Sequence, residues 1–398
     1  MSKKKRNLFE RIVNEGRRFA RRQKSANEVA SMRKLLAQDL ASGSRIALRI
    51  RGGIGDHLIT ARFVRDLLAE TGGFNFDIFT PRVPIAEWLF SDLPGFKISY
   101  YDRYLWRHAS PCYPLSIEID QLVLPQYDTA DWLTITRRHP KLARICNLLE
   151  ERFPAFEACA EYLPFLDGHL ARIATFMGMR RADLMHKTCG IKYGGDHYPL
   201  KTSLDALTKY ELNGKKFVTV SNGFDAEFNS RTTRATKVYP HMNQLTKLIK
   251  MAHPDIKIVQ IGNSTSSPLD SADLNLINAT TITEVTGLLD HAELHIDSEG
   301  GLVHIATAVG TKCCVLFGPT APEYFGYDSN FNIAPNICGN CYWITRNWMD
   351  QCVKYEHPRC LFEQPPESVF ETVRPYLAER MASDGQRSAT LLQLHHAI

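Results

Sequence analysis

After a lysine- and arginine-rich start, short apolar runs alternate with longer stretches of helical periodicity. Ile46–Ile50 and Phe76–Thr80 are typical of buried strands, and Leu58–Glu70 between them is typical of a helix. This alternation predicts parallel sheets, because parallel strands need a long crossover connection. A second set of runs begins at Phe217–Ser221, after a polar, glycine-containing stretch near residues 190–214 that we interpret as a linker.

The length of 398 residues is more than one domain usually needs, so we expect an α/β protein with two doubly wound domains. The expected parts are a basic helical extension over 1–40, domains over 41–200 and 210–365, and a closing helix and tail over 366–398. We expect the closing helix, Pro366–Ser383, to be interrupted at Pro375. The other expected strands are Leu122–Leu124, Ile256–Ile261, Leu294–Asp297 and Cys313–Phe317, with helices at Met242–Met251, Ile282–His291 and Leu302–Val309.

The positive charge is concentrated at the start of the chain. Met1–Lys34 holds 12 Lys and Arg against three Glu, a net charge of +9, so the overall +5 leaves −4 for the rest. A nucleic-acid enzyme would carry its positive field on the folded body, so this class is disfavoured. The amphipathic pattern of the start allows contact with an anionic membrane or a solvated, partner-docking arm. Without a membrane-spanning run or a signal-peptide core, we expect a cytoplasmic protein, with peripheral contact at the inner membrane through residues 1–34 as one option.

A glycine loop follows the first strand and carries a carboxylate. Gly53-Ile54-Gly55 is similar to the start of a dinucleotide fingerprint, but Leu58 stands where the third glycine belongs, and Asp56 would repel a pyrophosphate. A dinucleotide-dependent oxidoreductase is therefore disfavoured. Two roles stay open for Asp56, a general base in an interdomain cleft and a cap on the helix that follows.

The second half places several polar and glycine-rich segments just after expected strands, so they could converge on one sheet edge. Gly300-Gly301 opens a helix whose backbone N–H groups can bind a diphosphate, and Lys237 can add a point charge. The segments are Asn222-Gly223, Thr236–Pro240, Asp297–His304 and Gly318-Pro319-Thr320.

Four motifs in this order resemble glycosyltransferase family 9, the bacterial heptosyltransferases, over about residues 45–375. The resemblance implies two Rossmann-like domains facing a cleft (GT-B type), acceptor domain first and donor-binding domain second. It also implies inversion at the anomeric carbon, an ADP-activated heptose as donor and no catalytic metal. The motifs are Gly53–Asp56, Thr236–Pro240, Glu299–Ala306 and Leu316–Pro322.

By this resemblance, Asp56 is the general base, Lys237 contacts the donor diphosphate and Gly300-Gly301 forms the backbone cradle. Glu299 stands where the family usually has Asp, so the resemblance supports the reaction better than it supports heptose. The expected acceptor is a surface glycan of the lipopolysaccharide-core type. The alternatives are protein O-heptosylation of the autotransporter type and a non-catalytic nucleotide-sugar-binding protein. The remaining expected donor-binding residues are Asp297, Glu299, His304 and Thr320.

Four cysteines gather near the end of the second domain, at Cys338, Cys341, Cys352 and Cys360. Four thiolates at this density suit a tetrahedral zinc or iron site, and a similar cluster in the autotransporter branch of the family resembles an iron-binding finger. Any such metal would be structural, because four thiolates leave no position for substrate. The other reading is that the four are reduced thiols that only pack.

Overall fold

The predicted basic extension, residues 1–40, lies almost wholly outside the part of the chain that the structure describes, as does the tail after Ser383. Val29 is one of the few described residues of this segment, and it is buried beside Phe79 and Trp106. The computed structural model describes Asn27, Val29–Ser31, Lys34 and residues 45–102, 105–127, 129–157, 165–203, 205–225 and 235–383.

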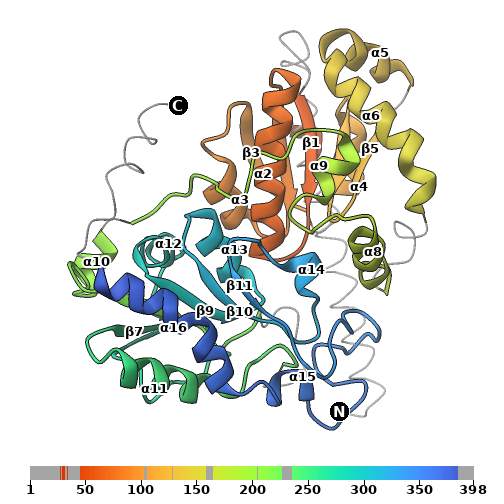
Figure 1. Cartoon of the computed structure of the whole chain (residues 1–398). Coiled ribbons are helices and arrows are strands. Elements are labelled where there is room, and N and C mark those ends of the chain that lie inside the picture. Colours follow the sequence, from red (N-terminus) through yellow and green to blue (C-terminus); the bar gives the residue numbers. More distant parts are fainter. Residues whose placement is uncertain are drawn as a thin grey trace, which may run out of the picture. The chain divides into compact units, whose positions relative to one another are not determined.

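The chain forms two compact units, coloured along the sequence in Figure 1. The first unit takes in the chain up to Ala160 and the later segment Asp183–Gly194. The second unit takes in Glu161–Ala182 and the chain from Gly195 onward. Each contains its own sheet, and each is described by itself below.

The sheet of the first unit has the strand order β3-β2-β1-β4-β5. The first four strands are parallel, whereas β5 runs antiparallel to β4. Only the short turn from Asp120 to Leu122 separates these two strands, which is too short for a parallel crossover. The strands are β1 (Arg45–Ile50), β2 (Asn75–Thr80), β3 (Phe96–Tyr101), β4 (Ser116–Ile119) and β5 (Val123–Gln126).

Helix α2 begins at Ile54, within the glycine loop, and so starts earlier than the predicted Leu58. It ends at Thr71, and the following Gly72 caps it with a left-handed φ of 83°, which glycine adopts without strain. Asp66 on α2 accepts a hydrogen bond from His186 Nε2 at 2.9 Å and so attaches α9 to α2. The helices of this unit are α2 (Ile54–Thr71), α3 (Val83–Phe90), α4 (Trp106–Ala109), α5 (Thr129–Arg138), α6 (Pro140–Arg152) and α9 (Leu184–Cys189), with 3-10 turns at Ser110–Cys112 and Phe153–Ala155.

The second unit has a six-stranded sheet with the order β11-β10-β9-β6-β7-β8, and every pair in it is parallel. The chain winds outward from β6 to β8 and then returns to β9 on the other side of β6. This is the Rossmann order, and its switch point lies between β6 and β9. The strands are β6 (Phe217–Val220), β7 (Lys257–Gly262), β8 (Leu274–Ile277), β9 (Leu294–Ser298), β10 (Cys313–Leu316) and β11 (Phe331–Ile333). The two-domain α/β fold expected from the sequence is confirmed.

Helix α12 matches the predicted bounds because a capping box fixes its start: Thr281 accepts from the amide of Glu284, and Glu284 accepts from that of Thr281. Helix α16 differs from the prediction, since it runs without interruption through Pro375. Its buried face continues on both sides of the proline, with Val373 and Leu377 fully buried. The helices are α8 (Phe165–Phe176), α10 (Asp205–Lys209), α11 (Met242–Ala252), α12 (Ile282–His291), α13 (Gly301–Ala308), α14 (Pro322–Phe325), α15 (Arg359–Phe362) and α16 (Pro366–Ala382).

Helices α11 and α16 lie together on one face of the second sheet (Figure 1). Leu245 and Ile249 of α11 pack with Val373 and Leu377 of α16 over the strand residues Val218 and Val220. Burying side chains of this size contributes roughly 1.5–3 kcal/mol each. The apolar stripe of α11 therefore fixes this helix on the sheet that positions the candidate site.

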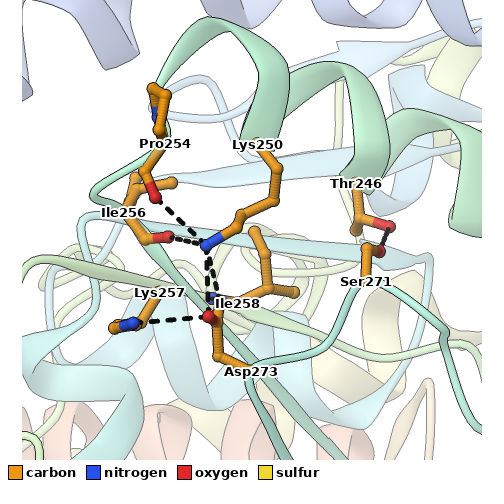
Figure 2. Close-up of polar contacts among 8 residues, drawn as sticks. All are labelled: Thr246, Lys250, Pro254, Ile256, Lys257, Ile258, Ser271 and Asp273. Carbon is orange, nitrogen blue, oxygen red and sulfur yellow. Dashed lines mark hydrogen bonds and ion pairs between the residues drawn. The ribbon is translucent and has the colours of Figure 1, made fainter.

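A polar network joins α11 to the residues that flank β7 and β8, as Figure 2 shows. Lys250 of α11 donates to the carbonyls of Pro254 and Ile256, at 3.2 and 3.0 Å, and to the Asp273 carboxylate at 3.0 Å. Asp273 also accepts from the Ile258 amide at 2.8 Å. Burial raises the pKa of Asp273, but the Ile258 amide and the lysine charges outweigh burial and hold this pKa below its usual 3.8.

We expect Asp273→Asn to lower the free energy of unfolding by about 1–2 kcal/mol at neutral pH, because charge-assisted hydrogen bonds are lost. A carboxyl whose pKa is lowered by folding stabilises the protein above its unfolded pKa, and this stabilisation is lost as the pH falls. The difference between variant and wild type should therefore shrink below about pH 4. Denaturant unfolding at pH 7 and pH 3.5 measures it. The control is Asp270→Asn, whose side chain is 73% exposed and should change nothing measurable. An equal loss at both pH values would contradict the account.

Candidate active site

The glycine loop of the first unit lies at the carboxyl end of β1, beside the switch point between β1 and β4. Asp56, in the first turn of α2, accepts a hydrogen bond from the Gly53 amide at 2.9 Å. A Cβ at Gly52 would lie 2.2 Å from Asp56 Oδ2, and Gly52 has a φ of 91°. The loop therefore wraps closely around the carboxylate. The capping role is present in the structure, while the role of Asp56 as base stays a prediction.

His57, next to Asp56 in the first turn of α2, also contacts the glycine loop. Its Nδ1 lies 2.8 Å from the Gly53 carbonyl and its Nε2 lies 2.6 Å from Thr80 Oγ1. Thr80 Oγ1 also accepts from the Arg82 amide at 3.1 Å, so its hydroxyl is available to donate to Nε2. Burial lowers the pKa of His57 more than the Gly53 carbonyl and Asp56 raise it. A neutral His57 thus joins the loop to the end of β2.

A charged pocket lies on the first unit, and the sequence analysis did not identify it. Its volume is about 570 Å³. Arg49 on β1 donates to Asp102 at 2.7 Å and to both oxygens of Glu118 at 3.1 Å. The available signal was a charged residue among the apolar residues of each of two strands, Arg49 in β1 and Glu118 in β4, which lie opposite each other in the sheet. The lining side chains include Arg49, Asp102, Trp106, Arg107, Glu118 and Gln126.

The candidate site of the second unit begins where β9 ends and α13 starts. No described side chain caps the N-terminus of α13, whose Ncap is Gly300 in an extended conformation. The hydroxyl oxygens of Ser298 and Thr320 are buried, and neither has a hydrogen-bond partner among the described residues. Ser298 ends β9, and Thr320 closely follows the neighbouring strand β10. Unsatisfied hydroxyls beside an open helix N-terminus are the features of an anion site.

Lys237 and Glu299 form an ion pair at this site, with side chains only 18% and 9% exposed. Asp297 is 5% exposed, and burial raises its pKa although His295, the Ser298 amide and the Lys237 charge oppose this. His295 Nε2 lies 3.6 Å from the Asp297 carboxylate. We call this set the donor edge: Lys237, Asp297, Ser298, Glu299, Gly300, Gly301 and Thr320.

His304 lies one turn into α13, and the structure gives it a partner of its own. Its Nδ1 lies 2.6 Å from the Tyr327 hydroxyl, and the two rings pack edge to face. This contact explains the burial of His304 without a ligand. Its predicted role in donor binding stays a prediction. Ser298 lies in the predicted segment Asp297–His304 but was not singled out there, and it joins the donor edge through its buried hydroxyl.

The thiols of the four cysteines are close enough in space to influence one another electrostatically. Burial, together with the charges of Cys338, Cys341 and Cys352, raises the pKa of Cys360 to about 12. Among the described residues, however, no group of three or more Cys, His, Asp or Glu side chains is placed to hold a metal ion. The donor set suits a thiophilic metal, but as placed these thiols do not form a site for one. The predicted metal site therefore finds no support in this geometry.

Several solved structures share the two-domain fold, and they are glycosyltransferases of the GT-B class. The iron-containing heptosyltransferase TibC in complex with ADP-D-β-D-heptose aligns with a TM-score of 0.54 and 12% identity, over 85% of this chain and 76% of that one. TibC from enterotoxigenic E. coli H10407 aligns with a TM-score of 0.52 and 12% identity, over 85% of this chain and 77% of that one. A family 9 glycosyltransferase from Veillonella parvula aligns with a TM-score of 0.50 and 12% identity, over 84% of this chain and 98% of that one.

The model of glycosyltransferase family 9 (heptosyltransferase) matches residues 226–357. The matched residues include the whole donor edge and three of the four cysteines. This match agrees with the family expected from the sequence motifs and with the expectation of a glycosyltransferase. No curated protein sequence matches the chain significantly.

Proposed function

We propose that this protein transfers a heptose from an ADP-heptose, with inversion, to a bacterial surface glycan of the lipopolysaccharide-core type. The observation that carries the proposal is the donor edge. It combines an uncapped helix N-terminus, a lysine and two buried hydroxyls without partners at the switch point of a Rossmann sheet. A nucleoside diphosphate group fits this chemistry. TibC was solved with an ADP-heptose, and we carry that donor class over as part of the proposal.

In the proposed reaction, the Asp56 carboxylate takes the proton from an acceptor hydroxyl. The hydroxyl oxygen then forms a bond to the anomeric carbon on the face opposite the diphosphate, and the bond between that carbon and the phosphate oxygen breaks. The electron pair leaves with the nucleoside diphosphate. Lys237 and the amides of Gly300 and Gly301 stabilise the negative charge that develops there.

For the acceptor we propose the pocket around Arg49 on the first unit. The Asp102 and Glu118 carboxylates can accept hydrogen bonds from sugar hydroxyls, while Arg107 and Gln126 can donate them. Arg49 keeps both carboxylates in place, and its guanidinium lies 5.6 Å from the centre of the Trp106 ring. A pocket with both donors and acceptors suits a polyhydroxylated ligand better than an apolar one.

Two alternatives are separated by their products. Protein O-heptosylation of the autotransporter type would use the same donor edge but would leave the sugar on a polypeptide. A non-catalytic nucleotide-sugar-binding protein would bind the donor without consuming it. Asp56 at the glycine loop favours catalysis over binding alone, because a carboxylate there can serve as a base.

The test is mass spectrometry of purified protein incubated with ADP-, GDP- and UDP-sugars, with and without core oligosaccharide. We expect ADP-heptose to be consumed, with a heptose added to the oligosaccharide. Heptose on a polypeptide would favour the first alternative. Binding of a nucleotide-sugar without turnover would favour the second, and no binding would contradict the proposal.

We propose further that Cys338, Cys341, Cys352 and Cys360 hold one structural zinc or iron ion, because four thiols lie close together in the sequence, although their side chains would have to reorient to form the site. Elemental analysis of protein purified without added metal should find about one ion per chain, and Cys341→Ser should lower both that content and the melting temperature. Donor binding should weaken as well. Metal-free wild-type protein that is folded and active would contradict this.

The reason for the effect on donor binding is a contact between this segment and the loop that carries Lys237. Thr236 donates from its amide to Met349 O and from its hydroxyl to Trp348 O, both at 2.8 Å. Loss of order around the cysteines would therefore reach Lys237. Cys112→Ser on the first unit is the matched control, because it lies outside the cluster.

We also propose that the basic start of the chain contacts an anionic membrane surface. Among the described residues, no helix combines the length and the hydropathy that crossing a bilayer requires. Removing residues 1–24 takes away ten of the 12 Lys and Arg residues of Met1–Lys34 and keeps Val29, which packs with Trp106. Co-sedimentation with phosphatidylglycerol vesicles should fall while turnover of a soluble acceptor is retained. Unchanged co-sedimentation would contradict membrane contact.

A further inference from the structure

Lys237, whose positive charge the proposed donor needs, is already paired with the Glu299 carboxylate. Both side chains are largely buried, at 18% and 9% exposure, so water screens their attraction only weakly. Lys237 is also the only lysine or arginine of the donor edge as defined above. A diphosphate that is to bind Lys237 must therefore compete with the Glu299 carboxylate.

The remaining groups of the donor edge are ready for an anion. The α13 N-terminus has no side-chain cap among the described residues, and its Ncap is Gly300. Ser298 and Thr320 are only 4% and 2% exposed, and the hydroxyl of neither has a hydrogen-bond partner among the described residues. Unlike these groups, Lys237 is already bound to a carboxylate of the protein itself, that of Glu299.

Glu299 cannot stay where it is once a diphosphate arrives. Its carboxylate would then face phosphate oxygens of the same charge in a partly buried site, which is destabilising. Buried carboxylates need hydrogen-bond donors, and a nucleotide-sugar brings them as the hydroxyls of its sugar. A free nucleoside diphosphate brings no sugar hydroxyls at this position and carries one more negative charge.

We infer that Glu299 acts as an internal competitor that makes the site discriminate between a nucleotide-sugar and the corresponding nucleoside diphosphate. With a nucleotide-sugar, Lys237 passes to the diphosphate and Glu299 accepts hydrogen bonds from the sugar. After transfer the sugar is gone, so Glu299 returns to Lys237 and favours release of the nucleoside diphosphate. The inference rests on the proposed function, since it assumes that the donor binds at this edge.

The experiment is titration calorimetry with pyrophosphate, ADP and ADP-heptose on wild type, Glu299→Gln and Lys237→Ala. The matched control is Glu284→Gln, because Glu284 forms a Lys–Glu pair with Lys209 elsewhere in the same unit, at 2.6 Å. Glutamine keeps the size of the side chain and removes the competing charge. We expect Glu299→Gln to bind pyrophosphate and ADP about tenfold more tightly, and ADP-heptose no more tightly than wild type does. Glu284→Gln should bind all three ligands as wild type does.

The combinations of variant and ligand in this experiment separate a failure of the inference from a failure of the proposed function. If Lys237→Ala weakens pyrophosphate binding but Glu299→Gln binds ADP no more tightly than wild type, the inference is wrong and the donor site stands. A gain that is equal for ADP and ADP-heptose also overturns it, because discrimination is then absent. Equal pyrophosphate affinity in wild type and Lys237→Ala, or no binding by any protein, overturns the donor site and the inference with it.

Discussion

Asp56→Asn should lower turnover by about 10²–10⁴ while donor affinity changes by no more than a few-fold, because a positioned general base contributes this much to a rate. The substitution is well suited to the site. An asparagine Oδ1 can still accept the hydrogen bond that Asp56 receives from the Gly53 amide, so the start of α2 should stay intact. The measurements are steady-state turnover of ADP-heptose and a donor titration.

A second substitution separates catalysis from loop structure. A Cβ at Gly52 would lie 2.2 Å from Asp56 Oδ2, and the left-handed φ of Gly52 adds strain to any other residue there. Gly52→Ala should therefore lower the melting temperature and turnover together, whereas Asp56→Asn should lower turnover alone. Turnover retained in Asp56→Asn would leave Asp56 with its capping role only.

Lys237→Ala should weaken ADP binding by about 1.5–3 kcal/mol, or roughly 10- to 150-fold, the range for hydrogen bonds to charged groups. Titration calorimetry with ADP measures it. Lys247→Ala, a 52% exposed lysine on α11, is the control and should bind ADP like wild type. An unchanged dissociation constant in Lys237→Ala would place the donor elsewhere.

Much of the fold could be predicted because its signals are local. Ile282–His291 has the same bounds in prediction and structure, and a capping box within the first turn of the helix explains this. Strand β4 escaped notice because Glu118 interrupts a short apolar run, and its partner Arg49 is far away in the sequence. The continuous α16 was missed for a related reason. Burial of Val373 and Leu377 against the sheet outweighs the local effect of Pro375.

The residues of the donor edge could be proposed from the sequence, but their contacts could not. Strand ends and glycine pairs indicate where an anion could bind, so Lys237 and Gly300-Gly301 were found. The pairing of Lys237 with Glu299 joins residues 62 positions apart and depends on loop geometry that no periodicity encodes. The unpartnered Ser298 hydroxyl is likewise invisible in the sequence, because serines at strand ends usually find a partner.

The central claim is that the donor diphosphate binds at the donor edge of the second unit, and a crystal structure of the protein with ADP-heptose tests it most directly. The account predicts phosphate oxygens within hydrogen-bond distance of Lys237 Nζ, the amides of Gly300 and Gly301 and the hydroxyls of Ser298 and Thr320. A diphosphate bound instead at the glycine loop around Gly53, or at the pocket beside Arg49, would contradict it.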